Sequence, residues 1–247
     1  MDQQHRGFNI IEQEYKSTQT LPVTRTFIAN VFLWMTLALA VTAVTAYWFA
    51  STPELIGSLR NLQTGGLSIL GWIVMLAPLG FVLLMSMGFQ RLSPAIMTLL
   101  FIAFSVLMGM SLSFILLVYT GSSVFKTFAV TSAMFGVMAV LGYTTKTDLT
   151  KFGSILMMAL FGVIIAMVVN MFMHSSTMDY IISVLGVLIF TGLTAYDVQK
   201  LKRIGAGIGV DVQNPDVKKM SILGALTLYL DFINLFLFLL RFLGNRK

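Results

Sequence analysis

Apolar residues form long, nearly uninterrupted runs along this chain, and charged residues lie mostly at the ends of the runs or between them. An α-helix needs roughly 20 apolar residues to cross the hydrocarbon core of a bilayer. Seven runs are about this long: 26–50, 67–89, 94–119, 124–143, 152–173, 180–200 and 221–243. The pattern therefore predicts seven transmembrane helices.

Composition agrees with a membrane protein. The chain has 247 residues, of which 57% are hydrophobic and 11% charged, and a water-soluble protein of this size could not cover so much apolar surface. We expect an all-α fold with a polar N-terminal tail, residues 1–24, and a transmembrane domain, residues 25–247. The chain has no cysteine, which excludes disulfides, thiolate catalysis and zinc–thiolate sites.

The positions of the basic residues predict the orientation. Cytoplasmic loops of membrane proteins carry an excess of Lys and Arg. A cytoplasmic N-terminus would place most of the 16 basic residues on the cytoplasmic side: Arg6, Lys16, Arg25, Arg91, Lys146, Lys151, Lys200, Lys202, Arg203, Lys218 and Lys219. The other side would hold Arg60 and Lys126, and also the basic C-terminal tail if the last helix crosses fully. A last helix that re-enters would return that tail to the cytoplasmic side, and both alternatives stay open.

The basic residues are scattered through short loops, so they do not form a nucleic-acid-binding surface. Small residues also recur four positions apart within the predicted helices, a spacing that lets helix backbones approach closely. We expect these pairs to pack inside the bundle: Ser105 and Gly109, Ser132 and Gly136, Gly162 and Ala166.

Two aspartates inside the last two apolar runs are the main candidates for function. A carboxylate within a bilayer costs roughly 2.5–3.5 kcal/mol on insertion scales, so it usually faces a cavity or a partner. Asp231 has no basic residue within one helical turn and needs a partner on another helix. Asp197 has Lys200 one turn away, so an ordinary interfacial ion pair is an alternative for it.

The two aspartates are expected to meet, because the last two predicted helices are antiparallel neighbours. Two adjacent carboxyl groups would share a proton and titrate as a pair. Their oxygens also suit Ca²⁺, so protons and a hard cation would compete for the same site. The pair Asp197 and Asp231 is therefore a candidate site for pH sensing and for binding a calcium ion.

Three further polar residues are candidates for weaker roles. Arg91 follows the second predicted helix and is either a topology anchor or a counter-charge for the aspartates. Asn170 and Asn234 lie within predicted helices and can give polar support, or can simply bond a neighbouring helix.

The segments around the aspartates, TAYDVQKLK over 194–202 and LTLYLDFINLF over 226–236, resemble the Bax inhibitor-1 family, also called transmembrane Bax inhibitor motif proteins. With the seven-span layout, the resemblance extends over about residues 20–245. It implies six helices around a central C-terminal helix and a pH-sensitive calcium leak. Asp197 and Asp231 match the family's paired aspartates, and Arg91 matches by position an arginine that latches the closed state in bacterial members.

The resemblance further implies a prokaryotic member in the plasma (inner) membrane, without a required cofactor. The expected partners are the lipid bilayer, Ca²⁺, protons and membrane proteins, but no nucleic acid. A non-conducting regulator that binds proteases or stress proteins is the main alternative function.

An enzyme is not expected. Intramembrane aspartyl proteases also place two aspartates on adjacent helices, and two carboxyls that share a proton can activate water. However, Asp231 follows Leu-Tyr-Leu, where those proteases have Gly-x-Gly, and no proline follows Pro215. The sequence also has no HExxH or GxSxG motif.

Overall fold

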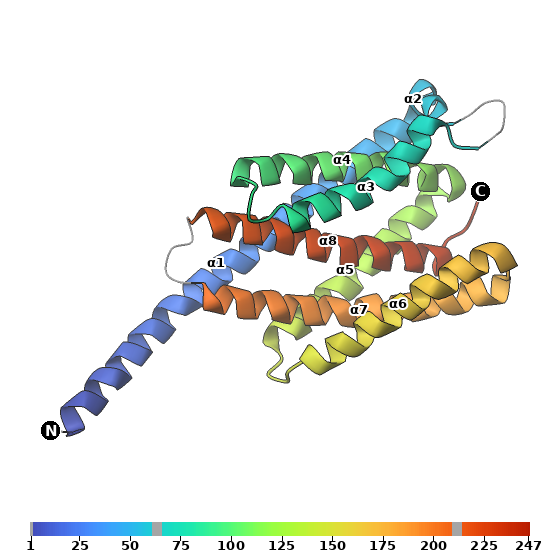
Figure 1. Ribbon diagram of the computed structural model, residues 1–247. Helices are drawn as coiled ribbons and strands as arrows, with labels where there is room; N and C mark the ends of the chain where they lie inside the picture. The colour runs from blue at the N-terminus through green and yellow to red at the C-terminus, as the bar shows by residue number, and fades with distance from the viewer. Residues whose placement is uncertain (1, 61–65, 209–213) are drawn as a thin grey trace.

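The computed structural model describes the backbone of residues 2–60, 66–208 and 214–247, and the side chains from Val23 onward within these ranges. The described ranges contain eight α-helices and no strand (Figure 1): α1 Asp2–Ser51, α2 Pro53–Ser58, α3 Ile69–Met87, α4 Pro94–Val118, α5 Gly121–Thr144, α6 Thr150–Met173, α7 Ser176–Gly207 and α8 Pro215–Leu243.

Seven of these helices are long and apolar enough to cross a membrane. They are the part of α1 from Val23 to Ser51, and α3 to α8 over their full lengths. The prediction of seven spans in an all-α membrane protein is therefore confirmed.

The short helix α2 and the full lengths of α7 and α8 were not predicted. Pro53 occupies the first turn of α2, where its missing N–H is no loss. Helix α8 begins at Pro215, and the side chain of Asn214 accepts a hydrogen bond from the Asp216 N–H. A search for apolar runs does not detect helix ends that are formed by polar residues.

Helix α8 is the most buried span, with 72% of its most apolar stretch inside the protein, against 11% for α6. It packs against α1, α4, α5 and α7. Helix α6 packs mainly on α7 and lies on the far side of α7 from the bundle interior. The expected arrangement of six helices around α8 is not confirmed, because α6 is not one of the main neighbours of α8.

The small-residue pairs divide into two groups. Gly109 packs inside, because an added Cβ there would lie 2.7 Å from the Thr42 carbonyl oxygen of α1. In contrast, Gly136 and Gly162 have open space where a Cβ would be, and Ser132 is exposed. The prediction of internal packing is correct for the Ser105 and Gly109 pair and wrong for Gly136 and Gly162, whose faces of α5 and α6 point outward from the bundle.

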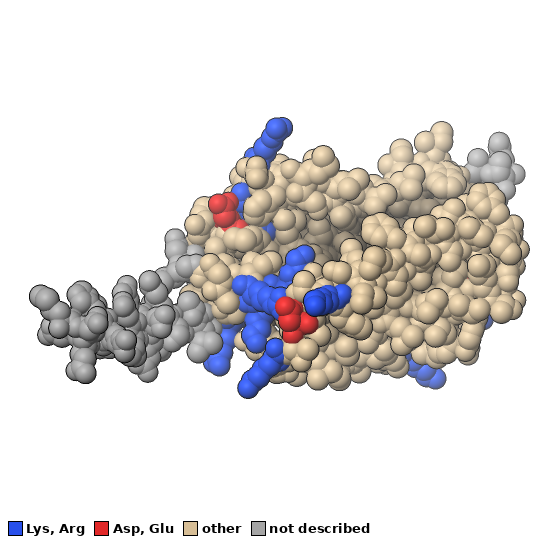
Figure 2. Space-filling model, turned by 60° about the horizontal axis from the view of Figure 1, so that its bottom comes forward, with Lys and Arg blue, Asp and Glu red and all other residues tan. Residues whose placement is uncertain are grey.

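The two ends of the bundle differ in charge. We call the end where α3, α5 and α7 terminate the basic end, and Figure 2 shows its charged side chains gathered near the grey N-terminal segment. The basic end holds Arg25, Arg91, Lys146, Lys151, Lys200, Lys202, Arg203, Lys218 and Lys219. The side chains of Arg6 and Lys16 lie outside the described residues.

The C-terminal tail lies at the opposite end. The Lys247 N–H donates to the Val118 carbonyl at 2.8 Å, and the Thr120 N–H donates to the Asn245 carbonyl at 3.1 Å. These bonds attach the tail to the turn between α4 and α5. Helix α8 therefore crosses the whole bundle and does not re-enter.

Candidate functional site

The structure brings Asp197 and Asp231 together. Asp197 lies on α7 and is 9% exposed, and Asp231 lies on α8 and is 5% exposed. Their carboxyl groups are within hydrogen-bonding range of each other. This contact follows from the close packing of α7 on α8, two helices that follow each other along the chain.

One oxygen of the pair has no partner. The Oδ2 atom of Asp231 is buried and accepts no hydrogen bond from any described residue. A buried polar atom without a partner costs about 1–3 kcal/mol, and more when it is charged. A site with an unfilled acceptor beside a second carboxyl group can hold a proton between the two groups or take up a cation.

The donor set fits a passing cation better than a tightly held one. No group of three or more His, Asp or Glu side chains that could hold a metal occurs in the described part of the chain. Ca²⁺ prefers six to eight oxygen ligands. Two carboxylates would have to be supplemented by water and backbone carbonyls, so binding here would be weak and reversible.

A cavity of about 480 Å³ lies between the end of α3 and the facing parts of α7 and α8. We call it the groove. Asp197 and Lys200 of α7, Thr227 of α8, and Phe89 and Gln90 beyond α3 contribute to its wall. The groove therefore connects the basic end with the carboxyl pair through Asp197.

Aromatic side chains fill the space around α8 close to Asp231. The Tyr229 ring packs against Phe104 of α4 with centroids 5.3 Å apart. The Phe232 ring packs against Phe128 and Phe135 of α5 at 5.4 and 5.5 Å. These edge-to-face contacts surround the turn of α8 that carries Asp231 with aromatic side chains.

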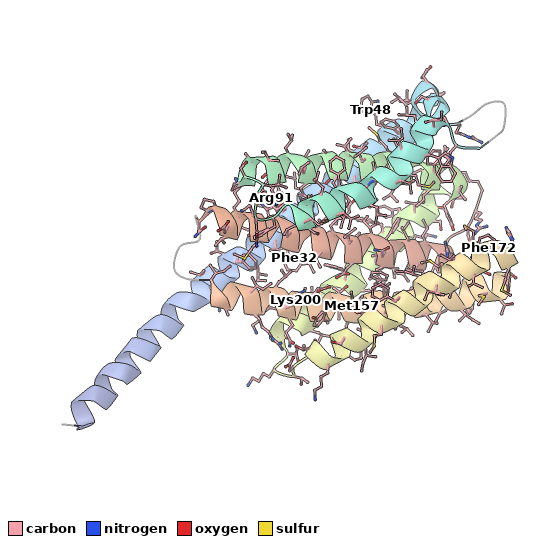
Figure 3. All side chains as sticks on the ribbon, in the orientation of Figure 1. Phe32, Trp48, Arg91, Met157, Phe172 and Lys200 are labelled. Atoms are coloured by element: carbon pink, nitrogen blue, oxygen red, sulfur yellow. The ribbon has the colours of Figure 1, made fainter. Side chains whose placement is uncertain are left out.

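The other predicted residues do not contact the pair. Arg91 lies at the turn between α3 and α4 (Figure 3), is exposed, and forms no ion pair with a described residue. Asn170 lies at the opposite end, where its Oδ1 accepts from the Ser175 N–H at 3.0 Å. Asn234 donates to the Leu230 carbonyl on its own helix at 2.8 Å. The hydrogen bonds of both asparagines are thus local, at the end of α6 for Asn170 and within α8 for Asn234.

A cation that the sequence pattern did not single out is buried beside the groove. Lys219 is 7% exposed, and its ammonium group contacts Asp216 and the turn between α3 and α4. By sequence it was only one of several basic residues that predict orientation. Its one available signal was an aspartate three positions earlier, at the start of an apolar run.

The loop between α5 and α6 is fastened to α7 at the same end. Arg203 donates to Asp148 at 2.6 Å and to the Thr150 hydroxyl at 2.8 Å. Gln199 donates to the Thr147 carbonyl at 2.7 Å. Hydrogen bonding to Thr150 and to Arg203 holds the pKa of the Asp148 carboxyl well below its usual range.

Comparison with known proteins places the chain in a family. The family described as "Inhibitor of apoptosis-promoting Bax1" matches residues 24–247. The chain is 46% identical to the inner membrane protein YbhL of Escherichia coli (strain K12), over 90% of this chain and 93% of that one. It is 44% identical to a protein of Rickettsia prowazekii (strain Madrid E), over 90% and 91% of the two chains. It is also 43% identical to one of Borreliella burgdorferi, over 93% and 96%. With seven membrane-length helices and this match, the chain is an integral membrane protein of the Bax inhibitor-1 family.

Proposed function

We propose that this protein is a pH-sensitive leak channel for Ca²⁺, gated by protonation of the Asp197 and Asp231 pair. The observation that carries the proposal is the buried contact between the two carboxyl groups, one of which keeps an oxygen without a partner. A proton and a cation would compete for these oxygens. The relatives are bacterial and one is named an inner membrane protein, so we place the channel in a bacterial inner membrane.

Electrostatics gives the pair its sensitivity to protons. Two unit charges 4 Å apart repel by about 4 kcal/mol at an effective dielectric constant of 20. The two carboxyls therefore stay in contact while they share a proton, and on losing it they either separate or attract a cation. Separation would move α7 relative to α8, which are packed closely along their lengths.

The route that we propose begins at the basic end, which we place in the cytoplasm. A cation enters the groove and reaches Asp197. It then passes to Asp231, which is more deeply buried. We propose that the aromatic contacts of Tyr229 and Phe232 block the rest of this route. The structure would then correspond to a closed channel.

The test is calcium flux into liposomes that contain the purified protein and a calcium dye. We expect flux in the wild type to change with pH between about 5 and 8, a range that a proton-sharing carboxyl pair can reach. We expect Asp231→Asn to abolish that pH dependence. Glu54→Gln is the matched control, because Glu54 is an exposed carboxylate on α2 and should keep the wild-type profile.

Absence of flux above empty liposomes at every pH would contradict the proposal. The function would then have to lie in binding membrane proteases or stress proteins, and a partner should co-purify with the protein even when the aspartates are neutralised. We assign no enzymatic reaction to the pair. Cleavage of a membrane peptide that is lost in Asp231→Asn would contradict this assignment.

A further inference from the structure

Lys219 is a buried cation at the start of α8. Its side chain is 8% exposed, whereas its neighbour Lys218 is exposed. Lysine is almost never fully buried unless it is paired. The interactions of Lys219 therefore need an explanation beyond membrane topology.

Three interactions satisfy the ammonium group. Its Nζ lies 2.8 Å from the Asp216 carboxylate, one turn earlier on α8. The same atom donates to the backbone carbonyl of Phe89 at 3.1 Å and lies 4.8 Å from the centre of the Phe89 ring. Lys219 thus joins α8 to the turn between α3 and α4 by a charge-assisted hydrogen bond and a cation–π contact.

This connection crosses a loosely packed boundary. Helix α3 packs mainly on α4 and makes only sparse contact with α8. The groove lies along this boundary, and Phe89 and Met220, which neighbour the Lys219 interactions, both form part of its wall. Phe89 and Leu92 of the turn also pack against the hydrophobic core, and the Lys219 ammonium group adds a direct hydrogen bond from α8 to the backbone of the turn.

We propose that Lys219 is a positioning residue that holds the turn between α3 and α4 against α8 and so narrows the groove that leads to Asp197. The exposed Arg91 in the same turn forms no ion pair with the described side chains. The charge that bonds this turn to α8 therefore comes from the buried lysine. The consequence for ion flux rests on the proposed function, but the effect on the groove does not.

The test uses the absence of native cysteines. Leu201 lines the groove and is 6% exposed, so Leu201→Cys reports on its opening. We would measure the labelling rate with a neutral, water-soluble maleimide in detergent, with and without Lys219→Met. Methionine keeps an apolar side chain of similar length and removes the ammonium group. Lys218→Met is the control for loss of charge.

We expect Lys219→Met to raise the labelling rate roughly tenfold, equivalent to about 1.4 kcal/mol of groove opening, and Lys218→Met to leave it unchanged. Lys219→Arg, which keeps a cation, should restore slow labelling. The proposal would be overturned if folded Lys219→Met were labelled no faster than the Leu201→Cys protein that keeps Lys219. An equal increase in Lys218→Met would also overturn it.

Asp216→Asn provides a second variant in case Lys219→Met does not fold. It removes the exposed partner of the ion pair and leaves the lysine, so we expect a smaller increase of about two- to fivefold. An unchanged rate in this variant, with Lys219→Met unfolded, would overturn the proposal. Faster labelling without any calcium flux would support the role of Lys219 and contradict only the channel function.

Discussion

The hydroxyl groups of Thr42 on α1 and Tyr229 on α8 are 2.8 Å apart in the buried centre of the bundle. Thr42 donates its own proton to the Ser105 carbonyl of α4 at 2.9 Å, so Tyr229 is the donor in the first bond. Tyr229 is fully buried and lies two residues before Asp231. This relay joins α1, α4 and α8 on a different face of α8 from the one that carries Asp231.

Tyr229→Phe should therefore destabilise the protein. The variant removes one buried donor, and a net hydrogen bond contributes about 0.5–1.5 kcal/mol, with membrane helix bonds near 0.6 kcal/mol on average. We expect a loss of this size in the free energy of unfolding, measured by denaturant titration in detergent. Tyr180→Phe is the control, because Tyr180 is 58% exposed. Equal stability of the two variants would contradict this account of Tyr229.

Gly142 sets the distance between α5 and α7. An added Cβ would collide with the backbone carbonyl of Ala195, two residues before Asp197. We expect Gly142→Ala to cost about 1–3 kcal/mol through overpacking. Gly136→Ala, in open space on the same helix, should be neutral or slightly stabilising. The thermal stabilities of the two variants would be compared by melting curves. If Gly142→Ala were as stable as Gly136→Ala, the two helices would not need this close approach.

Asp148 should stabilise the protein near neutral pH and lose this contribution in acid. Its folded-state pKa is lowered by Thr150 and Arg203, so its stabilising contribution is present above the unfolded value of about 4 and is lost as pH falls further. Asp148→Asn should thus be less stable than wild type at pH 6, and the difference should shrink below about pH 4.

The lowered pKa of Asp148 also makes this residue a control for gating. Because its carboxylate stays charged between pH 5 and 8, Asp148→Asn should keep the wild-type dependence of calcium flux on pH in that range. A flattened profile in this variant would mean that the loop between α5 and α6, and not the carboxyl pair alone, responds to protons.

The orientation can be tested with single cysteines at the two ends. Lys218→Cys lies at the basic end, and Lys126→Cys lies near the start of α5 at the opposite end. If the basic end is cytoplasmic, an impermeant thiol reagent should label Lys126→Cys in intact cells and Lys218→Cys only after lysis. The reverse pattern would contradict the orientation that we propose.

Much of the fold could be predicted because the bilayer fixes the length of an apolar helix. The predicted run 124–143, for example, corresponds to α5, Gly121–Thr144. The packing of the last two helices on each other was also predictable, because consecutive helices are usually adjacent in space, and this brought Asp197 next to Asp231. Helix bounds in polar segments, such as the start of α8 at Pro215, could not be read from hydrophobicity.

The rest of the site depends on three-dimensional packing. Thr42 looks like an ordinary residue of an apolar helix, and only the fold brings it to Tyr229. Arg91 and Lys219 are similar in sequence context, yet one is exposed and the other is 7% exposed. Asn170 is polar within an apolar run, but it serves the end of α6 far from the aspartates.

The most direct test of the central claim is a double-mutant cycle on the carboxyl pair. The flux of calcium into liposomes would be measured against pH for Asp197→Asn, Asp231→Asn and the double variant. If the two carboxyls act as one proton-sharing unit, each single variant should lose the pH dependence and the double variant should lose nothing further. Single variants that each keep part of the response, with effects that add in the double variant, would contradict the claim.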